Sequence, residues 1–290
     1  MPIQKNALTT NAPARKTRQW YRHVVRPVAQ DAIVRRRSGS RTYRGHCPDY
    51  LIIGANKCGT TALFQALTNH PSFAKPLFKE VHYLDRFPAK SQTWYFAHFW
   101  GPDDKLWGEA TPEYFELPDA PHRVSAFNTS PKLILCLRDP VARAVSHYYN
   151  AVDHEGETRS VTAAIEGEVA ALKDGRYART AAELRHAYVQ RSMYARSLEN
   201  WFSVFPKNQI LILVAERRKA NLAAAFEFLS VPSSSAPNIN TGPTNARAYP
   251  DPDAAIVSAI QDAVRPDLSR LAALLEWEGL PVEWRPGYAG

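Results

Sequence analysis

Cysteine is scarce in this chain, and the pattern of the few that occur excludes two kinds of site. Cys47, Cys58 and Cys136 form an odd set with neither CxxC nor Cys/His metal-ligand spacing. A disulfide framework and a zinc site are therefore not indicated, and we expect a reducing compartment. Long apolar runs are also absent, since none approaches the ~18 residues of a membrane-spanning helix, and the polar N-terminus has no signal-peptide core. We expect a soluble cytoplasmic protein.

Acidic residues are nearly absent from the first 48 positions. This basic arm (1–48) carries eleven Lys or Arg against the single Asp31, a net charge of +10, whereas the remainder has 25 basic and 27 acidic residues, a net of −2. The body (49–290) is therefore not basic, which disfavours a nucleic-acid-binding fold. The arm could contact anionic lipid, nucleic acid or a polyanionic substrate, or it could be a solvated tail.

Short apolar runs alternate with amphipathic stretches from residue 49 onward. "YLIIGA" (50–55), "KLILCLR" (132–138) and "QILILVAE" (209–216) are typical of buried parallel strands. Helical patterns follow at 60–69, 140–153 and 222–229, with more at 160–173, 191–204 and 254–277. The alternation predicts an α/β fold, a P-loop-like doubly wound parallel sheet of about five strands with its ligand site at the strands' carboxyl ends. The Pro- and Ser-rich stretch 230–253 predicts a long loop.

The first predicted strand leads into a glycine loop, "GANKCGTT" (54–61), that differs from a Walker A motif. Gly54 and Gly59 have the Walker spacing, but the only lysine, Lys57, lies inside the loop instead of after the last glycine. Backbone N–H groups and the hydroxyls of Thr60 and Thr61 predict an anion site at the start of the helix. Lys57 can reach a phosphate or sulfate oxygen as a mobile point charge.

The second predicted strand ends in a cation. A kinase that uses Mg-nucleotide should present an acidic metal ligand there, whereas "KLILCL" is followed by Arg138. Arginine at this position suits a second phosphate, and Ser146, about two helical turns later, could donate a hydroxyl to the same anion. An ion pair between Arg138 and Asp139 is the structural alternative.

These segments resemble the PAPS-dependent sulfotransferases, whose donor is 3′-phosphoadenosine 5′-phosphosulfate. "KCGTTAL" (57–63) is similar to the 5′-phosphosulfate loop and "LRDPVARAVSHYY" (137–149) to the 3′-phosphate-binding strand and helix. "KEVHYLDR" (79–86), "GEATPEYF" (108–115) and "NARAYPDPD" (245–253) resemble the catalytic segment, the next strand and the late cofactor loop of the heparan sulfate sulfotransferase branch. Five motifs in the right order across some 200 residues make the resemblance specific to a bacterial-type enzyme of this branch.

The resemblance implies a donor site for PAPS, with PAP as product and no metal required. A sulfonyl group carries less negative charge than a phosphoryl group, so its transfer can proceed without Mg²⁺ when the leaving phosphate is stabilised. That role is implied for Lys57, with the loop holding the 5′-phosphate and Arg138 and Ser146 holding the 3′-phosphate. The implied cofactor-binding residues are Lys57, Cys58, Gly59, Thr60, Thr61, Arg138, Ser146, Asn245 and Arg247.

The same resemblance implies the catalytic base. In an extended segment, Glu80 and His82 would point to one face, with Asp85 just beyond. Glu80 is the implied general base, and His82 and Asp85 would orient it or the acceptor. A surface carboxylate beside Lys79 is the alternative. His98 and His147 are weaker candidates, because a lone histidine is more often structural.

Departures from the branch pattern bear on the acceptor. Ala110 and Asn245 stand where heparan-type enzymes carry basic residues, so we expect an acceptor smaller or less charged than heparan: a small molecule, a glycolipid or another carbohydrate, sulfated on a hydroxyl in preference to an amine. Cys58 stands where a small residue is usual; the helix terminus could acidify its thiol, although small size is the simpler explanation. The aromatic run 94–100, with Tyr114 and Phe115, could line the acceptor pocket or pack the core.

Two other function classes stay open from the sequence. A P-loop kinase or another nucleotide-binding protein would explain the glycine loop, but the missing lysine after Gly59 and the arginine after the second strand oppose it. A non-enzymatic module that binds anions or nucleic acid would explain only the basic arm.

Overall fold

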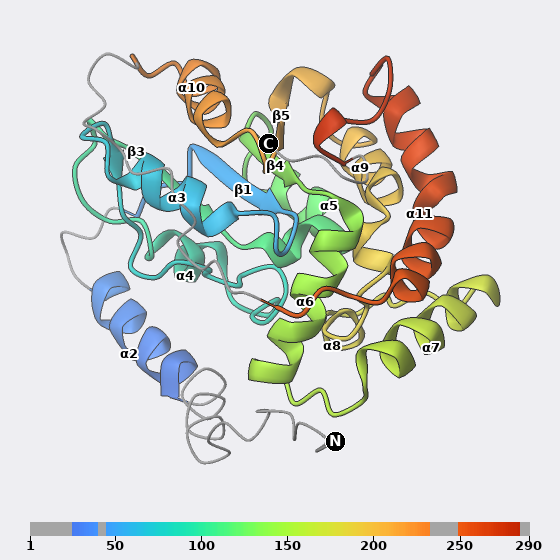
Figure 1. Cartoon of the computed structure of the whole chain (residues 1–290). Helices are drawn as coiled ribbons and strands as arrows, with labels where there is room; N and C mark the ends of the chain where they lie inside the picture. Colours follow the sequence, from blue (N-terminus) through green and yellow to red (C-terminus); the bar gives the residue numbers. More distant parts are fainter. Residues whose placement is uncertain (1–24, 40–44, 233–248, 285–290) are drawn as a thin grey trace.

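A five-stranded parallel sheet forms the centre of the molecule (Figure 1). The computed structural model describes residues 25–39, 45–232 and 249–284. The strand order is β2-β3-β1-β4-β5, and every adjacent pair is parallel. The bounds are β1 Tyr50–Gly54, β2 Phe73–Ala74, β3 Leu106–Ala110, β4 Lys132–Leu137 and β5 Ile210–Val214. The predicted α/β class with a parallel sheet of about five strands is confirmed.

Helices cover the sheet because its strands are apolar on both faces. All five residues of β1 are buried, and in β4 every residue after Lys132 is buried. The α-helices around the sheet are α3 Thr60–Thr68, α4 Gln92–Phe96, α5 Ala120–Ser125, α6 Pro140–His154, α7 Val161–Lys173, α8 Ala181–Leu184, α9 Tyr194–Phe202, α10 Arg218–Phe228 and α11 Ala254–Leu274. Short 3₁₀ turns are η2 Pro112–Glu116, η3 Gln190–Ser192, η4 Lys207–Gln209 and η6 Val282–Trp284.

The carboxyl ends of β1, β3 and β4 lie at one edge of the sheet, where they lead into α3, η2 and α6. The start of α6 is encoded locally. Asp139 precedes the helix and its carboxylate accepts a 2.7 Å hydrogen bond from the Ala142 N–H, while Pro140 occupies the first turn, where no N–H is needed. The "RDP" triplet therefore ends a strand, caps a helix and leaves Arg138 at the edge.

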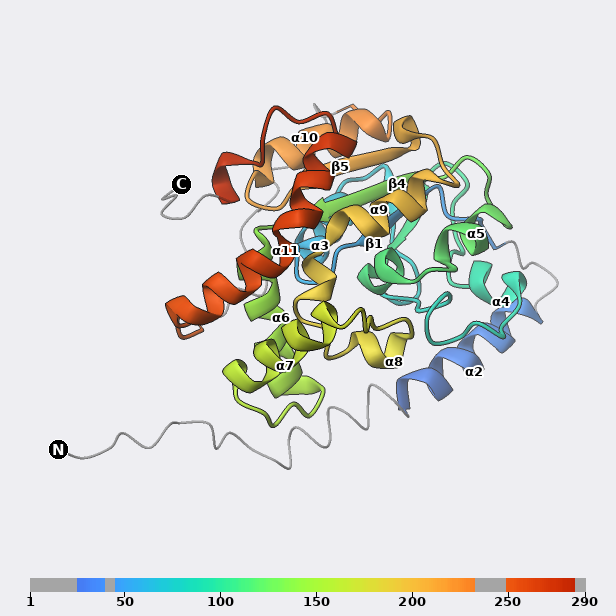
Figure 2. The ribbon, with the colours of Figure 1, turned by 90° about the vertical axis from the view of Figure 1, so that its right-hand side faces the viewer.

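A helix in the basic arm packs against the body. Helix α2 (Arg26–Ser38) lies beside α4 in both ribbon views (Figures 1 and 2), and Gln30 and Val34 are buried. The solvated-tail interpretation is therefore wrong for these residues, because a buried glutamine and valine require a packed surface.

Two expectations fall partly or wholly outside the described residues. The loop predicted over 230–253 is described only at its two ends, and Asn245 and Arg247 lie outside the described ranges. Among the residues described, no helix is long and apolar enough to cross a membrane.

Candidate active site

The loop between β1 and α3 has the backbone of an anion cradle. Gly59 precedes α3 with a φ of 81°, a left-handed conformation that favours glycine, and Lys57 has a φ of 70°. A Cβ placed on Gly59 would meet no heavy atom within 4 Å, so the space beside this glycine is open. Within the described residues, no side chain caps the N-terminus of α3. Its first N–H groups are therefore left without a side-chain acceptor there, and a bound anion could accept from them.

Two cations and helix α6 converge on this loop. The Arg138 guanidinium donates to the Lys57 carbonyl at 3.3 Å, and the Lys57 ammonium donates to the Asn150 side-chain oxygen at 3.2 Å. Asn150 and the buried Ser146 are four residues apart on α6, so they share one face of the helix. Lys57, Arg138 and Ser146 thus belong to one continuous region, as the sequence predicted.

Cys58 points into the core. Its sulfur lies 3.8 Å from the Tyr194 hydroxyl, and burial raises the pKa of the thiol to about 12 even though Arg143 acts in the opposite direction. The acidified-thiol interpretation is wrong. The Cys58 N–H donates to the Ala55 carbonyl at 3.2 Å, so it helps to close the turn.

The predicted catalytic segment is not extended. Glu80 and His82 have φ values of 61° and 60°, and a turn follows at 83–86. The extended-strand expectation is wrong, but the three predicted side chains still meet. His82 Nδ1 lies 2.8 Å from the Asp85 carboxylate, and His82 Nε2 lies 3.9 Å from the Glu80 carboxylate. The imidazole therefore bridges the two acids.

The Glu80 carboxylate is held in its charged form. Burial alone would raise its pKa, but the charges of Lys79 and His82, together with a hydrogen bond from the Lys79 ammonium, lower it below its ordinary value. The side chain is 31% exposed, so the carboxylate can still be approached from solvent. Glu80 thus makes both the Lys79 contact of the surface alternative and the histidine contact expected of a base.

Glu109, which the sequence analysis did not single out, anchors the catalytic segment. It is fully buried on β3 and accepts hydrogen bonds from the Val81 N–H (3.0 Å), the Tyr95 hydroxyl (2.6 Å), the Thr111 hydroxyl (2.7 Å) and the Tyr114 hydroxyl (3.1 Å). Burial raises its pKa, against the effect of these donors. A carboxylate within a buried strand was the available signal, because a buried acid requires several donors.

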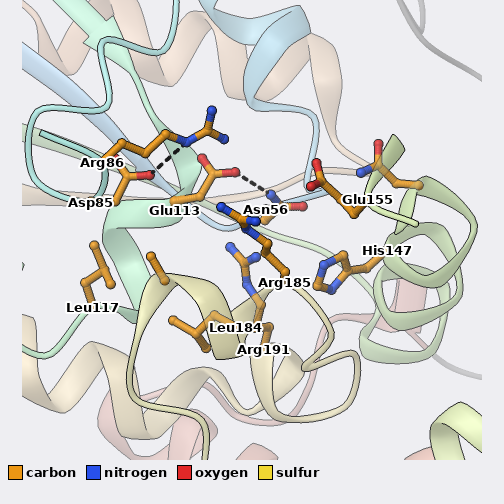
Figure 3. A pocket seen from close by; sticks show the side chains of 12 residues that line it. Asn56, Asp85, Arg86, Glu113, Leu117, His147, Glu155, Leu184, Arg185 and Arg191 are labelled. Carbon is orange, nitrogen blue, oxygen red and sulfur yellow. Dashed lines mark hydrogen bonds and ion pairs between the residues drawn. The ribbon is translucent and has the colours of Figure 1, made fainter. Parts of the chain in front are cut away.

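A cleft lies between the glycine loop and the catalytic segment (Figure 3). The Asn56 amide donates to one Glu113 oxygen at 3.1 Å, while the other Glu113 oxygen has no hydrogen-bond partner among the described residues. Asn56 Oδ1, Asp85 Oδ1 and His147 Nδ1 are likewise buried and unpartnered there. The residues that line the cleft are Asn56, Asp85, Arg86, Glu113, Leu117, His147, Asn150, Glu155, Ala181, Leu184, Arg185 and Arg191. Lys57 and Glu80 are not among them, but Asn56, which precedes Lys57, and Asp85, which contacts the same histidine as Glu80, are.

The remaining candidates separate into core and cleft residues. The 94–100 run packs the core through Trp94, Tyr95 and Phe99, all buried, as are Tyr114 and Phe115. His98 is fully buried, and burial lowers its pKa to about 4. His147 lines the cleft, with its pKa also lowered by burial. These histidines are therefore neutral at physiological pH.

The amino-acid sequence of this chain is similar to those of known sulfotransferases. A family model described as "Sulfotransferase domain" matches residues 47–234. Human heparan sulfate glucosamine 3-O-sulfotransferase 3B1 is 33% identical over 172 residues, which cover 59% of this chain and 42% of that protein. The membrane-associated sulfotransferase kil1 of Dictyostelium discoideum is 38% identical over 109 residues, 36% of this chain and 23% of that protein. The chain thus spans less than half the length of these curated relatives.

A solved structure has the same fold. The crystal structure of a sulfotransferase from Alicyclobacillus acidocaldarius matches with a TM-score of 0.69 and 22% sequence identity, covering 83% of this chain and 99% of that one.

Proposed function

The chain belongs to the sulfotransferase family, as the five motifs predicted, and on that premise we propose that it moves the sulfonyl group of PAPS to a hydroxyl group of a sugar-like acceptor. The residues that would hold the donor are those of the glycine loop and α6. The open space beside Gly59 and the uncapped N-terminus of α3 suit the 5′-phosphate. Arg138 and Ser146 suit the 3′-phosphate, which distinguishes PAPS from ADP or ATP.

The proposed reaction is a single in-line displacement. PAPS supplies the sulfonyl group. The Glu80 carboxylate takes the proton of the acceptor hydroxyl as the new oxygen–sulfur bond forms, and the bond from sulfur to the 5′-phosphate oxygen breaks with its electron pair leaving on PAP. Lys57 stabilises the charge that collects on this leaving oxygen. To reach it, the ammonium exchanges its hydrogen bond to Asn150 for one to the donor.

The cleft supports a hydroxyl-rich acceptor of low charge. Its unpartnered oxygens, on Asn56, Asp85 and Glu113, accept hydrogen bonds, and sugar hydroxyls donate them. Two of the cleft arginines already have carboxylate partners, since Arg86 Nε lies 3.7 Å from Asp85 and Arg191 lies 3.0 Å from Glu116. A polyanionic acceptor would approach the Asp85 and Glu113 carboxylates at a cost. The buried, unpartnered acceptor oxygens carry this part of the proposal.

The alternatives have less support. In a kinase, an acidic residue after β4 would hold the metal ion. Here the acidic residue after β4 is Asp139, and its carboxylate accepts the Ala142 N–H as a helix cap. The family match covers residues 47–234, which lie almost entirely in the body, so a module that binds only through the arm does not account for it.

Thermal shift tests the donor assignment. PAP should stabilise the protein well beyond an equal concentration of ADP, and Arg138→Ala should remove most of that difference. Equal shifts with PAP and ADP would contradict the 3′-phosphate assignment.

A screen with labelled PAPS tests the acceptor assignment. Neutral glycosides and heparan oligosaccharides should be compared at matched concentration, and label should pass to the neutral glycosides. Preferential sulfation of heparan oligosaccharides would overturn the low-charge assignment and leave the donor assignment intact.

A further inference from the structure

Three consecutive carbonyl groups of the catalytic segment are held by side chains of helix α2. The Arg26 guanidinium donates to the carbonyls of Lys79 and Glu80, the latter at 2.9 Å. One turn later on the same helix, the Gln30 amide donates to the Val81 carbonyl at 3.3 Å. Helix α2 precedes residues 47–234, the part of the chain that matches the family domain, so this grip comes from outside that domain.

The N–H groups of the same segment are held from the opposite side. Val81 donates to the Glu109 carboxylate at 3.0 Å, and Tyr83 donates to the Tyr114 hydroxyl at 2.8 Å. Glu109 and Tyr114 belong to β3 and η2, within the family domain. The backbone of the catalytic segment is therefore hydrogen-bonded on one side to β3 and η2 and on the other to α2.

The backbone of the segment needs such support. Glu80 and His82 occupy the left-handed region, which is strained for a non-glycine residue and persists only when surrounding contacts impose it. Arg26 is suited to the task because one of its guanidinium nitrogens, Nη2, donates to two neighbouring carbonyls. Its guanidinium also lies 5.5 Å from the centre of the Phe78 ring.

Helix α2 is anchored to the body apart from this grip. Asp31 accepts hydrogen bonds from the Trp94 indole at 2.9 Å and from Lys90 at 2.5 Å. Gln30 also lies 2.8 Å from His98 Nε2, and Val34 is buried. The helix is thus fixed on α4 by contacts that do not involve residues 79–81, so the two roles of α2 can be separated by mutation.

We propose that α2 is a positioning element for the catalytic base, in which Arg26 and Gln30 fix the carbonyls of residues 79–81 so that the Glu80 carboxylate stays in its place beside His82. The proposal rests on the proposed function in that Glu80 is taken as the base. Arg26 also acts through charge: with Lys79 and His82, the other charged groups around Glu80, it favours the ionised carboxylate.

Hydrogen exchange of the full chain tests the positioning role without any acceptor. Arg26→Ala should speed exchange of the Val81 and Tyr83 amides about tenfold, because the segment opens more often when one side of the grip is lost. Arg36→Ala removes the same charge from an exposed position of the same helix and should leave these amides unchanged. Unchanged exchange in Arg26→Ala, or equal acceleration in Arg36→Ala, would overturn the proposal.

Turnover separates positioning from stability. Arg26→Ala should lower kcat about tenfold while the KM for PAPS stays close to that of the parent. Asp31→Asn loosens α2 from α4 without touching residues 79–81, so it should lower Tm with little effect on kcat. A kcat loss in Asp31→Asn as large as that in Arg26→Ala would show that the loss follows from loosening the helix as a whole, and would overturn the specific role of the Arg26 contacts.

The pH profile supplies a second readout of the Arg26 charge. Its removal should raise the pKa of Glu80 and so move the acid limb of kcat to higher pH, whereas Arg26→Lys keeps the charge and should restore the limb. Arg26→Met keeps the apolar part of the side chain but has no N–H donor, so it serves if Arg26→Ala does not fold: it should still speed exchange at Val81. An unshifted limb in Arg26→Ala would overturn the charge role. If PAP fails to stabilise the parent protein, the donor assignment falls while the exchange result stands.

Discussion

The proposed donor site and the proposed catalytic segment lie on two sides of one cleft, yet they are built in different ways. The donor site sits where strands lead into helices: β1 into α3 through Gly59, and β4 into α6 through Asp139 and Pro140. The catalytic segment is irregular, and its shape depends on side chains from β3, η2 and α2. The residues proposed to bind the donor are thus positioned by turns and helix caps that nearby residues encode. Glu80, the proposed base, is positioned by contacts with residues far away in the sequence.

This difference predicts that mutations on the two sides will fail differently. Donor-site changes should alter the binding of PAP, because they remove groups that touch it. Changes around the catalytic segment should leave PAP binding nearly intact and lower kcat, because they disturb only the position or charge of the base.

Glu80→Gln should give the largest effect. The amide has the same shape but cannot take a proton, so turnover should fall by about a hundredfold or more while the thermal shift with PAP is retained. Steady-state kinetics and thermal shift on one preparation measure both. Arg138→Ala is the matched donor-side variant, expected to lose the PAP shift. Full activity in Glu80→Gln would place the base elsewhere.

Glu109→Gln should come next. Four donors converge on this buried carboxylate, and an amide presents an NH₂ group to some of them. We expect a loss of about 1–3 kcal/mol in the free energy of unfolding. Since Val81 loses its acceptor, kcat should also fall, by about tenfold. Denaturant unfolding and kinetics provide the two numbers.

Tyr95→Phe is the control for Glu109, because it removes one donor from the carboxylate and keeps the ring that stacks on Tyr83 at 4.4 Å. It should lower stability and spare kcat. If Glu109→Gln lowers stability alone, the sheet side does not position the base.

The same division explains how much could be predicted from the sequence. Glycine at the left-handed position, proline in the first turn of α6 and the apolar runs of β1, β4 and β5 are local signals. The predicted sheet is confirmed, and the glycine loop joins β1 to α3 as predicted, whereas its binding of the donor stays a proposal. Residues 79–86 could be recognised by resemblance, but their backbone could not be predicted, because its bonds go to residues 28 to 54 positions away. Helix α2 was not predicted, because its many charged residues obscure the spacing of its few apolar residues. The cytoplasmic location stays a prediction.

Glu113→Gln should produce a smaller effect, confined to the acceptor. One Glu113 oxygen accepts a hydrogen bond from the Asn56 amide. The other oxygen is buried and has no hydrogen-bond partner among the described residues, and Glu113 lines the cleft. The amide weakens the acceptance of a sugar hydroxyl, so the KM for the acceptor should rise several-fold with kcat and PAP binding little changed. Initial rates over a range of acceptor concentrations measure this. A change in the KM for PAPS alone would assign Glu113 to the donor side, and the acceptor role would be wrong.

Glu157→Gln should have the smallest effect on activity. Glu157 and Glu80 both have lowered pKa values, but only Glu80 is proposed to take part in the reaction. Hydrogen bonds from Arg159, aided by the Tyr188 hydroxyl and opposed by burial, bring the pKa of Glu157 to about 2. The Tyr188 carbonyl in turn accepts a hydrogen bond from the buried Arg143 of α6. Glu157 is therefore linked through Tyr188 to α6, the helix that carries Ser146.

Because this pKa lies below its ordinary value, the stabilisation by Glu157 is complete above about pH 5 and is lost as the pH falls toward 2. Glu157→Gln should therefore lower Tm by a few degrees at pH 7, and the gap from the parent should narrow below about pH 5 and close toward pH 2. Turnover at pH 7 should be unchanged, since Glu157 touches neither Glu80 nor the glycine loop. Thermal melts across this pH range test the claim, and a Tm gap independent of pH would mean that Glu157 acts through packing instead of charge.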